Sequence, residues 1–231
     1  MSTRKRGPYG PYSPEETRQK LIDVALELFR ARGYQGTSVQ MIAQRSQLTK
    51  GAFYHHFESK DDLLRQIHYV YASRVVETVR EISLADLGPV EKLREVIRGV
   101  VFTFAQYRSH VAIFYQEFRY LTGTAYSSIK DMHDEEEYLV IAMIQAGKNQ
   151  GVINAGTDPK LLLLAISGIT AWIYQWYDPE GSLSIEEIAD GLADIILLGA
   201  IPRENESTAS LPVGAIAGSK ALKSSSLGPT G

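Results

Sequence analysis

Small polar side chains and one lysine gather at the start of a short helix predicted over residues 49–57. Its first turn holds Thr49, Lys50 and Gly51, which offer a hydroxyl, an ammonium group and bare backbone to an approaching partner. The apolar residues spaced to pin this helix to a core are Leu48, Phe53 and Phe57. A helix held on one side, with a polar N-terminal end exposed, is typical of a recognition helix that enters the major groove of DNA.

The preceding residues predict the helices that must position this one. Ser38 is a favourable N-cap for a second short helix, and Ala43 is small enough to lie where two helices cross. Residues 46–48 form the turn between the two short helices. A longer helix before them starts with a capping box at Ser13 and ends at Gly33. Together these elements predict a helix-turn-helix.

Residue type and spacing agree with one known family at many positions at once. The matching stretches are Gly33-Tyr34-Gln35-Gly36-Thr37-Ser38, then Ile42-Ala43, then Thr49-Lys50-Gly51-Ala52-Phe53-Tyr54-His55-His56-Phe57, and Lys60. They resemble the DNA-binding domain of the TetR family of regulators over roughly residues 15–65. The family usually has glycine in the turn, where this chain has Gln47. A positive φ at Gln47 would cost roughly 1 kcal/mol.

The resemblance implies which side chains contact DNA. Lys50 would read bases, and Gln40 would reach base edges or phosphate. The residues implied as phosphate contacts are Thr37, Ser38, Thr49, Tyr54, His55 and Lys60. Gly51 and Ala52 would allow close approach to the groove. The basic residues 4–6 would form an arm that follows the DNA backbone or enters the minor groove.

The remainder of the chain also has helical periodicity, so we predict an all-α fold. A long helix over about 59–83 is followed by five further predicted helices, at about 89–107, 109–121, 126–150, 158–177 and 184–198. No stretch alternates with the period of a strand. The predicted organisation is a flexible basic arm (1–12), a helix-turn-helix DNA-binding domain (13–60), a ligand-binding and dimerisation domain (61–202) and a disordered tail (203–231).

The predicted middle helices are rich in aromatic residues, several of them tyrosines that need hydrogen-bond partners when buried. A largely apolar cavity with a few polar groups is typical of a ligand pocket. The candidate ligand-binding residues are Phe102, Tyr107, His110, Phe114, Tyr115, Phe118, Arg119, Trp172 and Trp176. We expect a small hydrophobic or aromatic effector. A loose resemblance of residues 114–121 and 176–181 to acyl-CoA-responsive family members makes an acyl-CoA one candidate.

A single helix-turn-helix reads a half-site, so a two-fold operator in double-stranded DNA requires a dimer. The last two predicted helices, 158–177 and 184–198, carry many apolar residues together with small ones at Gly168 and Gly191. The resemblance implies that these helices pair across a two-fold axis into a four-helix bundle, giving a homodimer. The alternative is that these two helices only complete the hydrophobic core of a single subunit.

Composition limits the other classes of function. Residues 1–60 carry a net charge of +5, whereas the whole chain carries −3. This segregation favours a regulator over a non-specific, architectural DNA-binding protein, which would need a more basic chain. The chain has no cysteine and no recognisable catalytic motif, so an enzyme is disfavoured and no cofactor is expected. His133 and residues 134–137 are interpreted as a solvated face and not as a metal site. We expect no signal peptide, no membrane span and a cytoplasmic protein.

Overall fold

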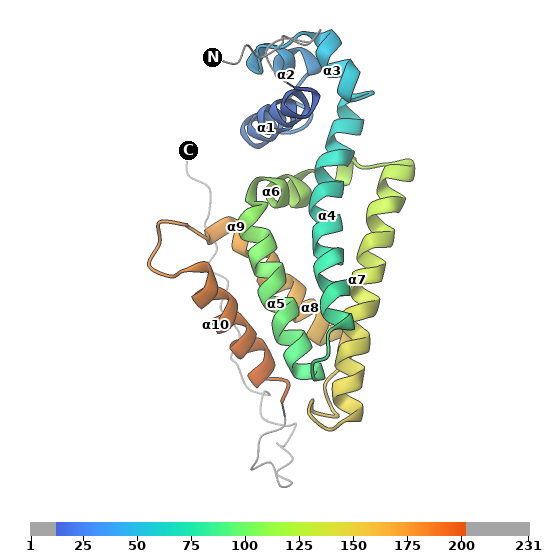
Figure 1. Cartoon of the computed structure of the whole chain (residues 1–231), viewed down its shortest axis with the longest axis vertical. Coiled ribbons are helices and arrows are strands. Elements are labelled where there is room, and N and C mark those ends of the chain that lie inside the picture. The colour runs from blue at the N-terminus through green and yellow to red at the C-terminus, as the bar shows by residue number, and fades with distance from the viewer. Residues whose placement is uncertain (1–12, 202–231) are drawn as a thin grey trace, which may run out of the picture. The chain divides into compact units, whose positions relative to one another are not determined.

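The computed structural model describes residues 13–201 (Figure 1), apart from the side chain of Ala125. The predicted basic arm and the predicted tail fall on residues 1–12 and 202–231, which lie outside the described residues. Within the described part all regular structure is helical, which confirms the predicted all-α fold. None of the described helices combines the length and the apolar character needed to cross a membrane.

The first three helices form the predicted helix-turn-helix unit: α1 (Pro14–Arg32), α2 (Val39–Arg45) and α3 (Lys50–His56). Each begins where its cap predicts. In the capping box of α1, the Ser13 hydroxyl accepts a hydrogen bond from the Glu16 N–H, and the Glu16 carboxylate accepts one from the Ser13 N–H. The core of this unit includes the fully buried residues Leu21, Phe29, Ile42, Phe53 and Phe57.

The turn between α2 and α3 places Gln47 where the family usually has glycine. Gln47 has a φ of 57°, in the left-handed region that favours glycine. It is the only residue other than glycine with positive φ in residues 13–201. The turn is held by the Leu48 N–H, which donates to the Ala43 carbonyl at 2.9 Å. The turn therefore keeps its shape at a conformational cost of about 1 kcal/mol.

Helix α4 (Lys60–Leu84) leads from the first three helices into the others. These are α5 (Pro89–Gln106), α6 (Arg108–Glu117), the 3-10 turn η1 (Phe118–Tyr120), α7 (Gly123–Asn149), α8 (Pro159–Ala171), α9 (Ile173–Trp176) and α10 (Ile185–Leu198). Figure 1 shows α4 running beside α7, with which it packs closely, while α10 packs on α5. Helix α6 contacts both α4 and α1, so it connects the two groups of helices.

The predicted single helix over 158–177 is wrong. Helix α8 ends at Ala171, and the short α9 follows after Trp172. No glycine or proline marks this break. The Thr170 hydroxyl lies at hydrogen-bond distance from the Ile166 carbonyl (2.8 Å) and the Ser167 carbonyl (3.3 Å). Such back-bonding slightly destabilises a helix and often bends it, although Thr78 makes the same bond to the Arg74 carbonyl within α4, which continues to Leu84.

Candidate functional site

The starts of α2 and α3 present two capping hydroxyls at the surface. The Ser38 hydroxyl accepts from the Met41 N–H at 3.2 Å, and the Thr49 hydroxyl accepts from the Ala52 N–H at 3.1 Å. Both residues are exposed. A hydroxyl that accepts a backbone hydrogen bond still has its proton to donate. These two groups are therefore fixed donors suited to phosphate oxygens.

The remaining predicted contacts of the recognition helix also reach solvent. Lys50, Gly51, Tyr54 and His55 are exposed, and Tyr54 is 56% exposed. Gln40 of α2 is exposed as well, whereas Ala52 is partly buried. A Cβ atom added at Gly51 would meet no atom nearer than the Thr49 hydroxyl at 3.6 Å. The fold therefore does not require glycine at position 51. A small residue there would instead allow a partner to approach the backbone closely.

Thr37 and Lys60 lie behind this surface. The Thr37 side chain is buried, and its hydroxyl donates to the Gly33 carbonyl at 3.0 Å. The Lys60 ammonium group donates to the carbonyls of Tyr34 and Thr37, both at 2.8 Å. In this structure both side chains hold the loop that precedes α2. Direct phosphate contact, as the sequence suggested for them, would require them to turn outward.

A polar junction surrounds the same loop. Glu117, at the end of α6, is only 6% exposed, and its carboxylate accepts a hydrogen bond from the Tyr34 N–H at 3.0 Å. The Tyr34 hydroxyl donates to Asp61, and the Lys60 ammonium lies 4.1 Å from the centre of the Tyr34 ring. Burial lowers the pKa of Lys60, although the charges of Asp61 and Glu117 act in the opposite direction. Burial and the bond to Asp61 raise the pKa of Tyr34.

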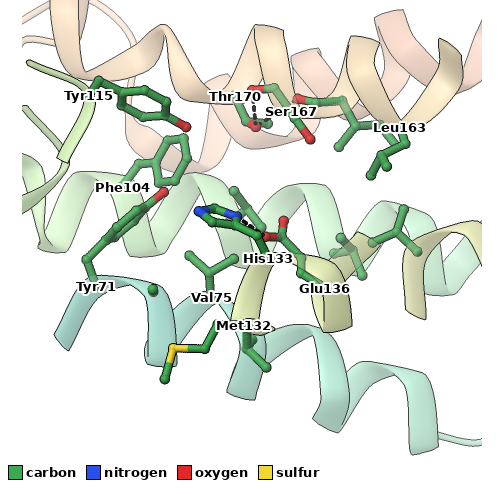
Figure 2. Close-up of a pocket in the computed structure, with 16 residues that line it drawn as sticks. Tyr71, Val75, Phe104, Tyr115, Met132, His133, Glu136, Leu163, Ser167 and Thr170 are labelled. Carbon is green, nitrogen blue, oxygen red and sulfur yellow. Dashed lines mark hydrogen bonds and ion pairs between the residues drawn. The ribbon is translucent and has the colours of Figure 1, made fainter. Parts of the chain in front are cut away.

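A cavity of about 80 Å³ lies among α4, α5, α7 and α8 (Figure 2). Its wall is mostly apolar, with Val75, Phe104 and Leu163 among the lining residues. The polar groups that line it are Tyr71, Tyr115, His133, Glu136, Ser167 and Thr170. Figure 2 shows the two tyrosines at one end of the cavity, His133 and Glu136 along its middle, and Leu163 at the other end. An apolar chamber with a few polar groups is typical of a ligand site.

The polar lining carries negative charge and hydrogen-bonding capacity. The His133 Nδ1 atom lies 3.4 Å from the Glu136 carboxylate. Burial and the nearby Glu136 charge raise the pKa of Tyr115 to about 12, so its hydroxyl is protonated near neutral pH. Burial likewise raises the pKa of Tyr71. No lysine or arginine lines the cavity. The described residues contain no group of three or more His, Asp or Glu side chains arranged to hold a metal ion.

Of the predicted effector residues, only Tyr115 lines the cavity. Phe114 and Phe118 pack edge-on against the buried ring of His68, and the Tyr107 hydroxyl accepts from Arg74 at 3.4 Å. Trp172 and Trp176 are 60% and 47% exposed. The others, Phe102, His110 and Arg119, also lie outside its lining. Of the aromatic residues of α6, Phe114 packs against His68 of α4 and Tyr115 lines the cavity, so the abundance of aromatic residues alone did not identify the cavity wall.

Sequence reasoning missed the polar lining on α4, α7 and α8, which includes Tyr71, Ser167 and Thr170. It treated residues 133–137 as a uniformly solvated face. Spacing carried a usable signal, because Met132, Glu136 and Val140 are separated by four residues each and share one face of α7. A carboxylate between two apolar residues on such a face points inward, and Glu136 does so here.

Two family models match this chain. Residues 21–67 match the model described as bacterial regulatory proteins of the tetR family, and residues 86–200 match the tetracyclin repressor-like C-terminal domain. The chain is 27% identical over 190 residues to the HTH-type transcriptional repressor KstR2 of Rhodococcus jostii (strain RHA1), covering 81% of this chain and 93% of the relative.

Solved structures agree with this assignment. The ketosteroid transcriptional regulator KstR2 of Mycobacterium tuberculosis superposes with a TM-score of 0.75 at 23% identity, over 80% of this chain and 95% of that one. AibR, solved in complex with isovaleryl coenzyme A and operator DNA, superposes with a TM-score of 0.68 at 29% identity, over 78% and 97% of the chains. With its helix-turn-helix and its matching C-terminal domain, the chain belongs to the TetR family and is a DNA-binding transcriptional regulator.

Proposed function

We propose that the chain is a repressor that binds a two-fold operator and leaves it when a small effector binds. The observation that carries the proposal is the exposed start of α3, where Lys50 stands beside the fixed hydroxyl of Thr49. Ser38, the N-cap of α2, and Gln40 in its first turn are exposed as well. A flexible cation at the tip of a recognition helix suits guanine O6 and N7, while the hydroxyls set the register on phosphates.

The cavity supports the effector half of the proposal. The relatives of this chain include the repressor KstR2, and the structure of AibR contains both isovaleryl coenzyme A and operator DNA. The cavity lies against the middle of α4, whose first residue, Lys60, holds the loop before α2. A ligand that shifts α4 would therefore change the placement of the recognition helix. By linkage, the effector weakens operator binding by the same factor by which the operator weakens effector binding.

An exposed apolar stripe on α8 supports a homodimer. Leu161, Leu164, Gly168 and Trp172 are exposed on one face of this helix and its end. A Cβ atom added at Gly168 would meet nothing within 4 Å. On α10, Ile195 and Leu198 are also exposed, while Asp190 and Asp194 pair with arginines of α5. Apolar stripes of this kind favour burial against a second copy.

The division into a DNA-binding domain (13–60) and a ligand-binding and dimerisation domain (61–202) is part of this proposal. Action on a bacterial operator implies a cytoplasmic protein. The alternative of a non-specific DNA-binding protein predicts that excess random DNA removes the protein from any probe. Specific regulators keep their operator under such competition, so the two alternatives give opposite results in one assay.

The test is an electrophoretic shift with DNA upstream of the protein's own gene and excess non-specific competitor, followed by footprinting. We expect a competitor-resistant complex with a two-fold symmetric footprint. Lys50→Ala should relax base preference and weaken the specific complex by about 5- to 150-fold, because one base contact contributes about 1–3 kcal/mol. The matched control is Lys130→Ala, which removes an exposed lysine from α7. If no site in the genome survives competition, the proposal fails.

A further inference from the structure

A polar recess lies outside the cavity, where residues of α1, α6 and α9 meet. Its volume is about 200 Å³. Its polar lining consists of Arg30, Arg108, Ser109, Gln116, Tyr174 and Gln175. No aspartate or glutamate lines it. The recess is therefore positively charged, in contrast to the cavity, whose lining contains Glu136 and no lysine or arginine.

The two arginines are available to a ligand. Neither Arg30 nor Arg108 forms an ion pair or a side-chain hydrogen bond with the described residues of the chain. The acids on α1 are engaged elsewhere, since Glu27 pairs with Arg45 at 3.7 Å and Asp23 accepts a hydrogen bond from Gln19 at 2.8 Å. Guanidinium groups bind phosphate oxygens through paired hydrogen bonds. Two unpaired guanidinium groups with hydroxyl and amide donors beside them suit a phosphate or pyrophosphate.

The lining of the recess and the lining of the cavity each contribute one tyrosine to a stacked pair. Tyr174 lines the recess, Tyr115 lines the cavity, and their rings stack with centres 5.6 Å apart and planes 7° from parallel. The cavity alone, at about 80 Å³, is smaller than the roughly 300–1,000 Å³ of usual ligand pockets. It therefore has room for only one end of a larger effector, and its Glu136 disfavours an anionic end.

We propose that recess and cavity are two parts of one effector site, and that the effector is an amphipathic organic phosphate. Its phosphate lies between Arg30 and Arg108, and its apolar end passes the Tyr115–Tyr174 pair into the cavity. The proposal rests on the proposed function, because it names the chemistry of that effector. It adds a physical link, since Arg30 belongs to α1 of the helix-turn-helix and Arg108 begins α6. A phosphate held by both ties the effector directly to the DNA-binding helices.

The recess is tested first with inorganic pyrophosphate alone, titrated into the full-length protein by calorimetry. We expect saturable binding that weakens about tenfold or more in Arg30→Gln and in Arg108→Gln, since a hydrogen bond to a charged group contributes about that factor or more. Arg32→Gln is the matched control, because it removes the same charge from the end of α1 outside the recess. The affinity of Arg32→Gln for pyrophosphate should stay within about twofold of the wild-type affinity. Absence of binding to the wild type at millimolar pyrophosphate, or equal loss in all three variants, overturns the proposal.

The link to the cavity is tested with hexanoyl-CoA and hexanoic acid. We expect the thioester to bind more tightly than the acid, and Arg108→Gln to weaken only the thioester. Leu163→Trp, which fills the far end of the cavity, should weaken hexanoyl-CoA while leaving pyrophosphate binding in place. If filling the cavity leaves hexanoyl-CoA affinity unchanged, recess and cavity do not form one site. Operator binding by the ligand-free wild type is measured separately, so its failure refutes the proposed function and leaves the pyrophosphate titration interpretable.

Discussion

The junction formed by Glu117, Tyr34 and Lys60 should contribute measurably to stability. Glu117→Ala leaves the Tyr34 N–H without its acceptor at 3.0 Å, in a place where Glu117 itself is 6% exposed. It also removes a negative charge near the partly buried ammonium of Lys60. A hydrogen bond to a charged group contributes about 1.5–3 kcal/mol, and we expect a loss of that size. Glu117→Gln keeps an oxygen acceptor and should lose only about half as much.

The assay is urea unfolding followed by circular dichroism at fixed protein concentration, together with thermal melts. For a chain of this length, about 2–4 °C of melting temperature corresponds to 1 kcal/mol, so Glu117→Ala should melt roughly 3–12 °C lower. Hydrogen exchange supplies a local readout, because the Tyr34 amide should exchange faster in Glu117→Ala than in the wild type. Glu81→Ala, an exposed residue of α4, is the control and should change stability by less than about 0.5 kcal/mol. If Glu117→Ala behaves like this control, the junction does not stabilise the fold and our reasoning about it is wrong.

Three further predictions follow from the described residues. Gln47→Gly should raise the free energy of unfolding by about 0.5–1 kcal/mol, because φ at this position is 57°, and a urea titration that shows no gain would contradict the strain. His68 is fully buried, neither ring nitrogen has a hydrogen-bond partner, and burial lowers its pKa to about 4 from 6.5. Between pH 6.5 and about 4, His68 is protonated in the unfolded chain but not in the folded one. The free energy of unfolding should therefore fall by up to about 3 kcal/mol as the pH drops from 6.5 to 4. His68→Leu should remove that part of the slope when unfolding is compared at pH values across the window. Trp172→Glu, at a residue 60% exposed on the α8 stripe, should convert dimer to monomer in light scattering, while Tyr138→Glu, at a residue 72% exposed on α7, should not.

Local chemistry explains why the helix starts could be predicted. The hydroxyls of Ser13, Ser38, Thr49, Ser59 and Ser184 each accept a backbone N–H in the first turn of the helix that follows. Such caps depend only on residues a few positions apart, so the sequence carries them completely. The positive φ at Gln47 was suggested in another way, by the resemblance, because the family usually has glycine at this position of the turn.

The cavity wall was not predictable in the same way. Which aromatic residues line a space and which fill an interface depends on how helices far apart in the chain pack. His68 and Phe114 show this, because they lie on α4 and α6, 46 positions apart by their numbering, and meet edge-on with ring centres 5.1 Å apart. Phe114, which the sequence favoured as a ligand contact, packs against His68 and does not line the cavity. Glu136 is the opposite case: it belongs to a run of charged residues that was interpreted as solvated, but it lines the cavity.

The position of α4 relates these local features to regulation. Its middle supplies Tyr71 and Val75 to the cavity wall, and its first residue, Lys60, binds the carbonyls of Tyr34 and Thr37. In the same loop, the Tyr34 N–H donates a hydrogen bond to the carboxylate of Glu117 on α6. Two helices, α4 and α6, therefore hold the chain directly before Ser38, which caps α2. A well-packed interior has little room to deform, so an effector group larger than the cavity of about 80 Å³ would displace helices that line it, of which α4 is one. Because Lys60 of α4 and Glu117 of α6 both bind the loop that leads into α2, we expect such a movement to reach the DNA-binding surface through these hydrogen bonds.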